Sequence, residues 1–150
     1  MQKPELLIDG LDFGEGPRWH DGLLWYSDFF QHSVYTVSPD GRRELVLDLD
    51  TEQPSGLGWL PNGDLLVVAM LERKLIRYNG QETSLHADLS DIATWHCNDM
   101  VVSESGIAYV GNFGYDYGSG VDPKMADLAA VFPDGKAVVA AESLNFPNGS

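Results

Sequence analysis

Two stretches of the sequence resemble each other: EGPRWHDGLLWYSDFFQHSVYTVSPDG at residues 15–41 and SGLGWLPNGDLLVVAMLERKLIRYNG at residues 55–80. A third copy, NDMVVSESGIAYVGNFG, occupies residues 98–114, and a fourth begins at Asn148. Self-similarity along a chain is the sequence signature of a repeat architecture. The repeats therefore predict a fold that is built from one repeated structural unit.

The spacing of the copies indicates which repeat architecture this is. The leading residues are Glu15, Ser55, Asn98 and Asn148, at intervals of 40, 43 and 50 residues. Within each interval, short runs such as GLLWYSDF and GDLLVVAM alternate with turn signals such as Pro-Asp-Gly and Pro-Asn-Gly, and helical periodicity is scarce. Four short strands per unit of this length predict an all-β fold of the β-propeller type. A β-sandwich could account for the individual hairpins, but it would not account for their recurrence at regular intervals.

The number of repeats predicts an incomplete ring. Propellers have roughly four to eight blades, and this sequence supplies about three blades plus the start of a fourth. The longest interval contains YDYGSGVDPKMAD at residues 115–127, which is rich in Gly and Asp and is expected to form a loop. We expect residues 1–150 to be the first half of one propeller domain. A second polypeptide, a second copy or the remainder of a longer chain would complete it.

Composition narrows the possible partners. The formal net charge is −14, from 23 acidic and 9 basic residues, which argues against nucleic acid as a partner. No apolar run is long enough to span a membrane, and the first residues lack the apolar segment of a signal peptide. The single cysteine, Cys97, is compatible with a reducing compartment. These features predict a cytoplasmic protein that binds neither nucleic acid nor membrane.

The residue that opens each repeat is polar. If it begins the innermost strand of each blade, then Glu15, Ser55, Asn98 and Asn148 all point into one central opening. Carboxylate and amide oxygens converging from several blades would suit a hard divalent cation. The alternative interpretation is ordinary turn chemistry, because Gly follows a polar residue in three of the four copies. The pattern alone leaves both interpretations open.

Several of these motifs together resemble the SMP-30/gluconolactonase/luciferin-regenerating enzyme family. They are EGPRW, LLWYSDF, SGLGW, the ND that leads into GIAYVGNFG, and FPNG; they occur in the family's order across nearly the whole chain. The resemblance implies a six-bladed propeller with one divalent metal ion (calcium, zinc, manganese or magnesium) in the central channel. It also implies a small-molecule substrate, a lactone or related ester, whose carbonyl is attacked by metal-activated water.

The resemblance also implies roles for individual residues. Glu15 and Asn148 match metal ligands of the family, and Asn98 matches an Asn that lies close to both metal and substrate. The family's general-base Asp would lie beyond Ser150, so activity is expected to need the missing half. The rival hypothesis is a non-catalytic propeller that binds a metal, a small ligand or a protein partner.

Two further residues are candidates for substrate binding. Many sugar lactonases of the family have Arg two residues before the ND motif, whereas this sequence has His96. A shorter side chain that is neutral near pH 7 predicts a less polar substrate than a sugar lactone. Asp116 lies where the family's substrate loop begins. The alternatives are a partly buried hydrogen-bonding role for His96 and a solvated loop position for Asp116.

The remaining aromatic, His and Cys residues are expected to be structural. Trp19, Trp25 and Trp59 occupy repeat positions and are predicted to pack within blades, while Trp95 suits either packing or the site. His20 and His32 lie in or beside predicted turns and are expected at the surface. Cys97 follows His96 directly, and neighbouring residues of a strand point to opposite faces, which argues against a Cys-His nucleophile pair.

Overall fold

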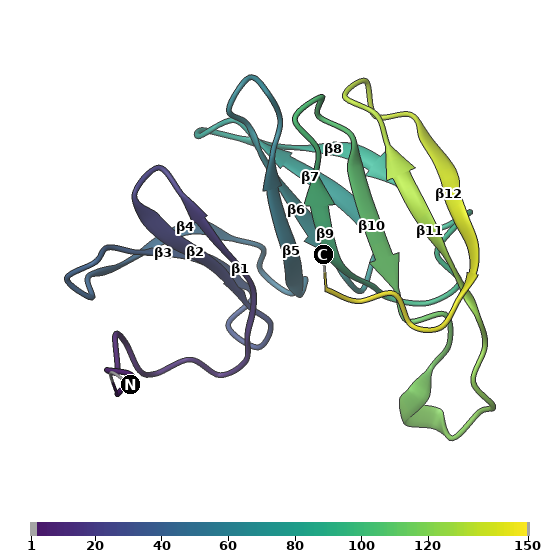
Figure 1. Ribbon diagram of the computed structural model, residues 1–150, viewed down its shortest axis with the longest axis horizontal. Helices are drawn as coiled ribbons and strands as arrows, with labels where there is room; N and C mark the ends of the chain where they lie inside the picture. Colours follow the sequence, from purple (N-terminus) through teal and green to yellow (C-terminus); the bar gives the residue numbers. More distant parts are fainter. Residues whose placement is uncertain (1–2, 150) are drawn as a thin grey trace.

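A computed structural model describes residues 3–149, whose regular secondary structure is almost entirely β-strand (Figure 1). The first sheet contains β1 (Gly14–His20), β2 (Leu23–Asp28), β3 (Ser33–Val37) and β4 (Arg43–Asp48). The second contains β5 (Pro54–Trp59), β6 (Leu65–Ala69), β7 (Lys74–Tyr78) and β8 (Thr83–Asp88). The third contains β9 (Cys97–Val102), β10 (Ala108–Asn112), β11 (Ala126–Val131) and β12 (Ala137–Leu144).

Each sheet is an antiparallel meander of four strands in sequence order. This confirms the prediction of an all-β fold, and the sheets correspond to the predicted repeats. The only helical segment among residues 3–149 is the 3₁₀ turn η1 (Tyr117–Ser119). It lies in the long β10–β11 connection, which projects away from the sheets at the lower right of Figure 1. That connection is the insertion that the sequence predicted as a loop.

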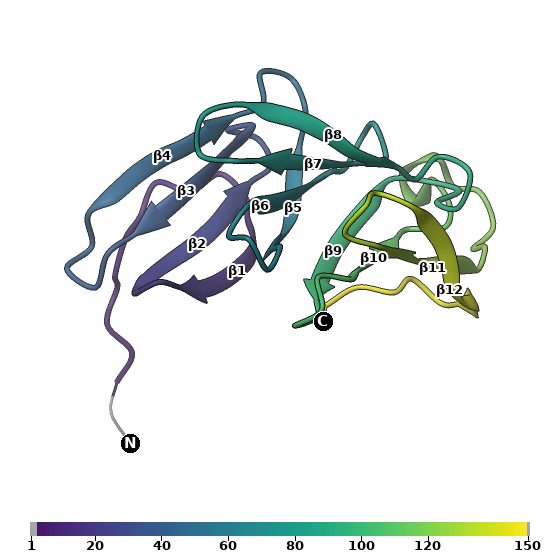
Figure 2. The ribbon, with the colours of Figure 1, turned by 90° about the horizontal axis from the view of Figure 1, so that it is seen from above.

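The three sheets are arranged as blades of a partial propeller. The first strands, β1, β5 and β9, lie against one another in sequence order, and Figure 2 shows the sheets fanning outward from them in an arc. Strands β4 and β8 lie at the outer rim of this arc. The described chain ends beside β9 in both views. The prediction that β1, β5 and β9 are the innermost strands therefore holds for the three blades present.

Burial follows this arrangement. Every residue of β6 and all but the last of β5 are buried, because the middle sheet is covered on both faces by its neighbours. Outer strands such as β4 and β12 have no neighbouring strand on their far side and remain largely exposed. One apolar cluster fills the space between the first two blades and includes Val34, Leu57 and Val67. A larger one fills the second and third blades and includes Leu66, Met100 and Val110.

Glycines set the distance between the innermost strands. A Cβ atom on Gly56 in β5 would clash with the backbone of Asp99 and Met100 in β9. A Cβ atom on Gly16 in β1 would lie 2.7 Å from the carbonyl oxygen of Ser55, and Gly16 also has a positive φ of 54°. The Gly that follows the polar residue therefore has a packing role, which the turn interpretation had not anticipated.

Two expectations about aromatic and His residues are wrong. Trp19 is 65% exposed, because its position in β1 faces solvent and not a neighbouring blade. His20 is only one-third exposed, because its ring stacks on Trp59 at a centroid distance of 3.8 Å. Trp25 completes this group with an edge-to-face contact to Trp59, so these two residues do pack, but between the first two blades and not within one.

Among residues 3–149, no helix has both the length and the apolar character needed to cross a bilayer.

The close approach of β5 and β9 yields a first prediction. We expect Gly56→Ala to lower the free energy of unfolding by about 3 kcal/mol, because the new methyl group meets backbone atoms that cannot rotate away. Gly118→Ala is the matched control, since its Cβ would make only an ordinary 3.4 Å contact with the Asp116 carboxylate. Urea titration followed by tryptophan fluorescence measures both. Equal stability of the two variants would contradict the role of Gly56.

Candidate active site

Three of the four predicted polar positions occupy the same place in successive blades. Glu15, Ser55 and Asn98 are each the second residue of the innermost strand. In each blade the pairing of the first two strands shifts register at this point, so the polar residue lies at a β-bulge. Bulges re-aim side chains and recur beside active sites. The repeat therefore presents one polar side chain per blade at the same end of the innermost strands.

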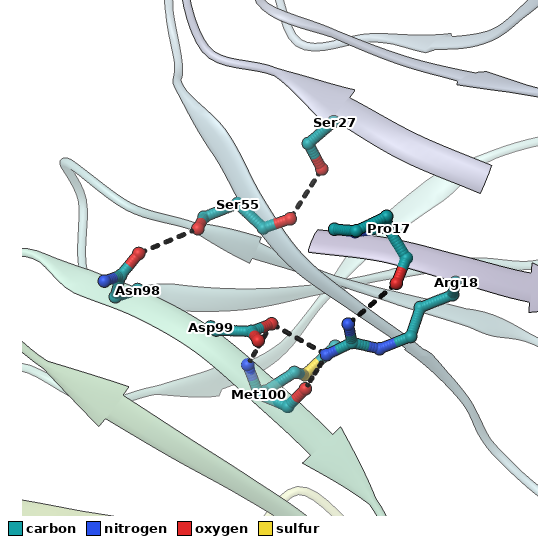
Figure 3. Close-up of polar contacts among 7 residues, drawn as sticks. All are labelled: Pro17, Arg18, Ser27, Ser55, Asn98, Asp99 and Met100. Atoms are coloured by element: carbon teal, nitrogen blue, oxygen red, sulfur yellow. Dashed lines mark hydrogen bonds and ion pairs between the residues drawn. The ribbon is translucent and has the colours of Figure 1, made fainter. Parts of the chain in front are cut away.

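Two of these side chains are in contact. The hydroxyl of Ser55 donates a hydrogen bond to Oδ1 of Asn98 over 3.1 Å, linking β5 to β9 (Figure 3). Both residues are buried, whereas Glu15 is only partly buried. The bond orients the Asn98 amide and leaves its NH₂ group and the second lone pair of Oδ1 available.

A charged pair lies beside this contact. Nη2 of Arg18, from β1, is 2.8 Å from Oδ1 of Asp99 and donates to the carbonyl of Met100 over 2.6 Å (Figure 3). The same carboxylate oxygen accepts a hydrogen bond from the Met100 backbone nitrogen. The side chains of Arg18 and Asp99 are 23% and 11% exposed. This contact joins the first blade directly to the third, on the residue that follows Asn98.

The fourth position, Asn148, takes no part in the Ser55–Asn98 hydrogen bond. It is exposed and borders a concavity of about 220 Å³ together with Asp99, Gly111 and Leu144. A Cβ atom on Gly111 would clash with the carbonyl oxygen of Pro147, which explains how the chain before Asn148 comes to lie so close to β10. The structure thus brings Asn148 next to Asp99.

A pocket of about 330 Å³ opens where the innermost strands begin. Its lining includes the residue found two positions before each polar position of the first three repeats: Phe13, Gln53 and His96. The equivalent residue of the fourth repeat, Phe146, stacks on Phe113 of the lining at a centroid distance of 4.7 Å. The repeat that sets the polar positions therefore also builds the rim of this pocket.

A second set of equivalent residues forms the floor of the pocket. These residues directly follow the second strand of each blade, are buried and cluster together; they are Phe29, Met70 and Phe113. The backbone nitrogen of each donates to the carbonyl of the rim residue in its own blade. The bonds are Phe29 to Phe13 (3.1 Å), Met70 to Gln53 (3.0 Å) and Phe113 to His96 (2.9 Å). Rim and floor are thus connected identically in all three blades.

His96 and Asp116, both predicted to contact substrate, line this pocket together. The imidazole of His96 stacks on Trp95 at 4.7 Å, and burial lowers the pKa of His96 below its usual value. The ring is therefore neutral at pH 7. Asp116 begins η1 and accepts a hydrogen bond from the Gly118 backbone nitrogen over 3.1 Å.

Cys97, next to His96, is buried, and burial raises its thiol pKa to about 12. It is therefore protonated at neutral pH and unsuited to act as a nucleophile.

The three predicted ligands, Glu15, Asn98 and Asn148, offer oxygen atoms, which suit a hard cation. Glu15 offers a carboxylate, and Asn98 and Asn148 offer amide oxygens, all of the type preferred by calcium or magnesium. Residues 3–149 contain no group of three or more His, Cys, Asp or Glu side chains placed to hold a metal ion. A thiolate-rich site for a soft metal ion is not expected, because the sequence has one cysteine, Cys97.

The sequence profile of the SMP-30/gluconolactonase/LRE-like region matches residues 13–150. The chain therefore belongs to this family. A search of curated protein sequences returns no match.

Solved structures with the same fold include members of this family. A gluconolactonase of Xanthomonas campestris superposes with a TM-score of 0.74 at 23% identity, covering 95% of this chain and 52% of that one. A regucalcin of Agrobacterium tumefaciens, described as a calcium-binding protein, gives 0.71 at 19% identity, covering 91% and 46%. A luciferin-regenerating enzyme gives 0.73 at 16% identity, covering 93% and 48%. The chain spans about half the length of these proteins.

Sequence reasoning singled out Glu15, Asn98, Asn148, His96 and Asp116, but it did not predict the aromatic pocket. The signal was present, because the rim residues all precede the polar positions by two. The floor residues were harder to find, since they are assigned only once the end of each second strand is known. The contact of Arg18 could not be predicted from a single sequence, because its partner Asp99 lies 81 positions away.

The Arg18–Asp99 pair yields a second prediction. We expect Arg18→Met to cost about 2 kcal/mol of unfolding free energy, because it leaves a largely buried carboxylate without its partner. Arg42→Met is the control: Arg42 pairs with Glu44 at 3.5 Å, but both side chains are exposed and the pair contributes little. Thermal unfolding of the two variants side by side measures the difference. A similar loss in both would assign Arg18 no special role.

His96 yields a third prediction, on pH. Because burial lowers its pKa in the folded state, the unfolded chain takes up a proton first as pH falls through about 6.5. Below that pH, His96 therefore lowers the free energy of unfolding. Above that pH, the imidazole is neutral in both states and has no such effect. We expect His96→Gln to lose less stability than the wild-type protein between pH 7.5 and pH 5, as measured by urea denaturation. Parallel pH curves would contradict the burial of His96.

Proposed function

We propose that this chain is the first half of a six-bladed propeller that hydrolyses a lactone or related ester with the help of one divalent metal ion. The observation that carries the proposal is the repeated placement of Glu15, Ser55 and Asn98 at the bulge of each innermost strand, next to the pocket. Membership of the SMP-30/gluconolactonase/LRE-like family supports it. The remaining blades lie outside residues 1–150 in this proposal.

In this proposal Glu15, Asn98 and Asn148 are the metal ligands from this half. A divalent ion held there would polarise a substrate carbonyl and lower the pKa of a water molecule. Calcium suits the oxygen donors best, and the calcium-binding description of the Agrobacterium regucalcin is consistent with it. The general-base Asp expected from the family belongs to the half outside this chain.

The other residues of the site contact the substrate or hold neighbouring side chains in place. Ser55 holds the Asn98 amide in one orientation through its hydrogen bond, and Arg18 holds the neighbouring Asp99. Neutral His96 can present a ring nitrogen to a substrate oxygen without adding charge. The apolar floor formed by Phe29, Met70 and Phe113 keeps water from the substrate side of the pocket.

The second candidate is a metal-binding propeller without turnover. It requires only the oxygen donors of Glu15, Asn98 and Asn148, and not the general base, which the proposed ligand set leaves to the half outside this chain. The two candidates share the metal ligands and differ only in hydrolysis.

Glu15 yields a fourth prediction, which tests the proposal. We expect Glu15→Gln to weaken Ca²⁺ binding at least about tenfold, because a carboxylate ligand becomes a neutral amide, and to abolish most lactone hydrolysis. Calorimetric titration with CaCl₂ and pH-stat hydrolysis of both gluconolactone and δ-decalactone, on the purified protein with its propeller complete, measure the two effects. Glu104→Gln, a change in an exposed turn, is the control.

The outcomes separate the candidates. Loss of both binding and hydrolysis supports a metal-dependent hydrolase. Metal binding that depends on Glu15, with no hydrolysis by the wild-type protein, favours the binding propeller. Unchanged Ca²⁺ affinity in Glu15→Gln would show that the proposed ligand set is wrong.

A further inference from the structure

We infer that the pocket at the start of the innermost strands selects lactones or esters with an alkyl or aryl substituent, and not polyhydroxylated sugar lactones. This inference rests on the proposed function, since it names the substrate class of the same site. It is carried by the chemistry of the pocket walls, which come from all three blades.

The walls are predominantly aromatic. From the first blade, Phe13 stacks on Phe29 at 5.1 Å and meets Phe30 edge-on at 5.8 Å. From the third blade, Phe113 contacts Tyr117 edge-on at 5.5 Å. Aromatic walls of this kind bind flat rings and alkyl chains by apolar burial and edge-to-face contacts.

Side chains with polar ends are a minority of the lining. They include Gln53, His96 and Asp116. The ring of His96 lies against Trp95, and one carboxylate oxygen of Asp116 already accepts from Gly118. A sugar lactone would bury several hydroxyl groups against this lining, and each buried hydroxyl without a partner opposes binding. The lining therefore disfavours a polyol and favours an apolar substituent.

The outer part of the lining is unusual for a surface. Phe13, Phe30, Leu71 and Tyr117 are all large apolar or aromatic residues that remain exposed, and all four line this one pocket. Large apolar side chains gathered at one exposed place mark a binding site. The volume of about 330 Å³ lies at the lower end of small-molecule pockets, which suits a small substrate better than a peptide.

The position of the pocket points to a substrate instead of an unrelated ligand. Its rim residues Gln53 and His96 immediately precede β5 and β9, two positions before Ser55 and Asn98. A molecule with its substituent on the aromatic walls therefore has its reactive group next to the polar residues of the proposed active site. The spacing of the repeat therefore places the substrate pocket beside the proposed reactive residues.

The test uses two six-membered lactones, each of which opens to a single hydroxy acid: δ-decalactone, with an alkyl chain, and gluconolactone, with hydroxyl groups. Hydrolysis is followed by pH-stat with the complete, calcium-loaded protein. We expect a higher kcat/KM for δ-decalactone. We also expect Phe30→Ser to lower it about tenfold, chiefly through KM, with little change for gluconolactone. Phe30 is 59% exposed, so the substitution leaves the core intact.

Trp19→Ser is the matched control, because Trp19 is an aromatic residue of similar exposure, 65%, outside the pocket lining. It should leave both substrates unaffected. A preference for gluconolactone, or an equal effect of Phe30→Ser and Trp19→Ser, would overturn the inference while leaving the lactonase proposal standing.

A second measurement separates the inference from the proposed function. An alkyl-substituted δ-lactam cannot be hydrolysed readily, and its binding is measured by calorimetry. Binding that weakens about tenfold in Phe30→Ser supports the apolar pocket even if neither lactone is hydrolysed, an outcome that would refute only the lactonase proposal. Absence of lactam binding to the wild-type protein would overturn the inference.

Discussion

The close backbone contact between successive innermost strands is the constraint on which the rest of this structure depends. Gly16 against Ser55, and Gly56 against Asp99 and Met100, let β1, β5 and β9 approach without intervening side chains. Because the strands are so close, side chains one position away can meet across blades. The Ser55–Asn98 hydrogen bond is one result, and the reach of Arg18 from the first blade to the third is another.

The same geometry divides the site into two chemically different zones. The second residue of each innermost strand is polar and lies at a bulge, whereas the residue two positions earlier reaches the rim of a largely aromatic pocket. The polar zone suits a hard cation and the aromatic zone an apolar substituent. A step of two residues along the chain thus separates the proposed metal ligands from the aromatic pocket.

The middle blade shows why the surroundings of the site are rigid. Its inner two strands are almost wholly buried, and the apolar clusters on its two sides pack against the first and third blades. A residue at the start of β5, such as Ser55, is therefore held from both sides. Asp116 and Tyr117 lie outside this frame, in the long β10–β11 connection.

The sequence by itself determined the architecture, because a repeat with turn signals encodes one blade at a time and each blade forms from local hairpins. It also determined the polar positions, since their spacing follows that repeat. Only the tertiary structure decided the exposure of Trp19, the stacking of His20 on Trp59, the Arg18–Asp99 pair and the aromatic pocket. The last three of these features arise between blades, where residues distant in sequence meet, and the repeat pattern does not show which side chains come into contact there.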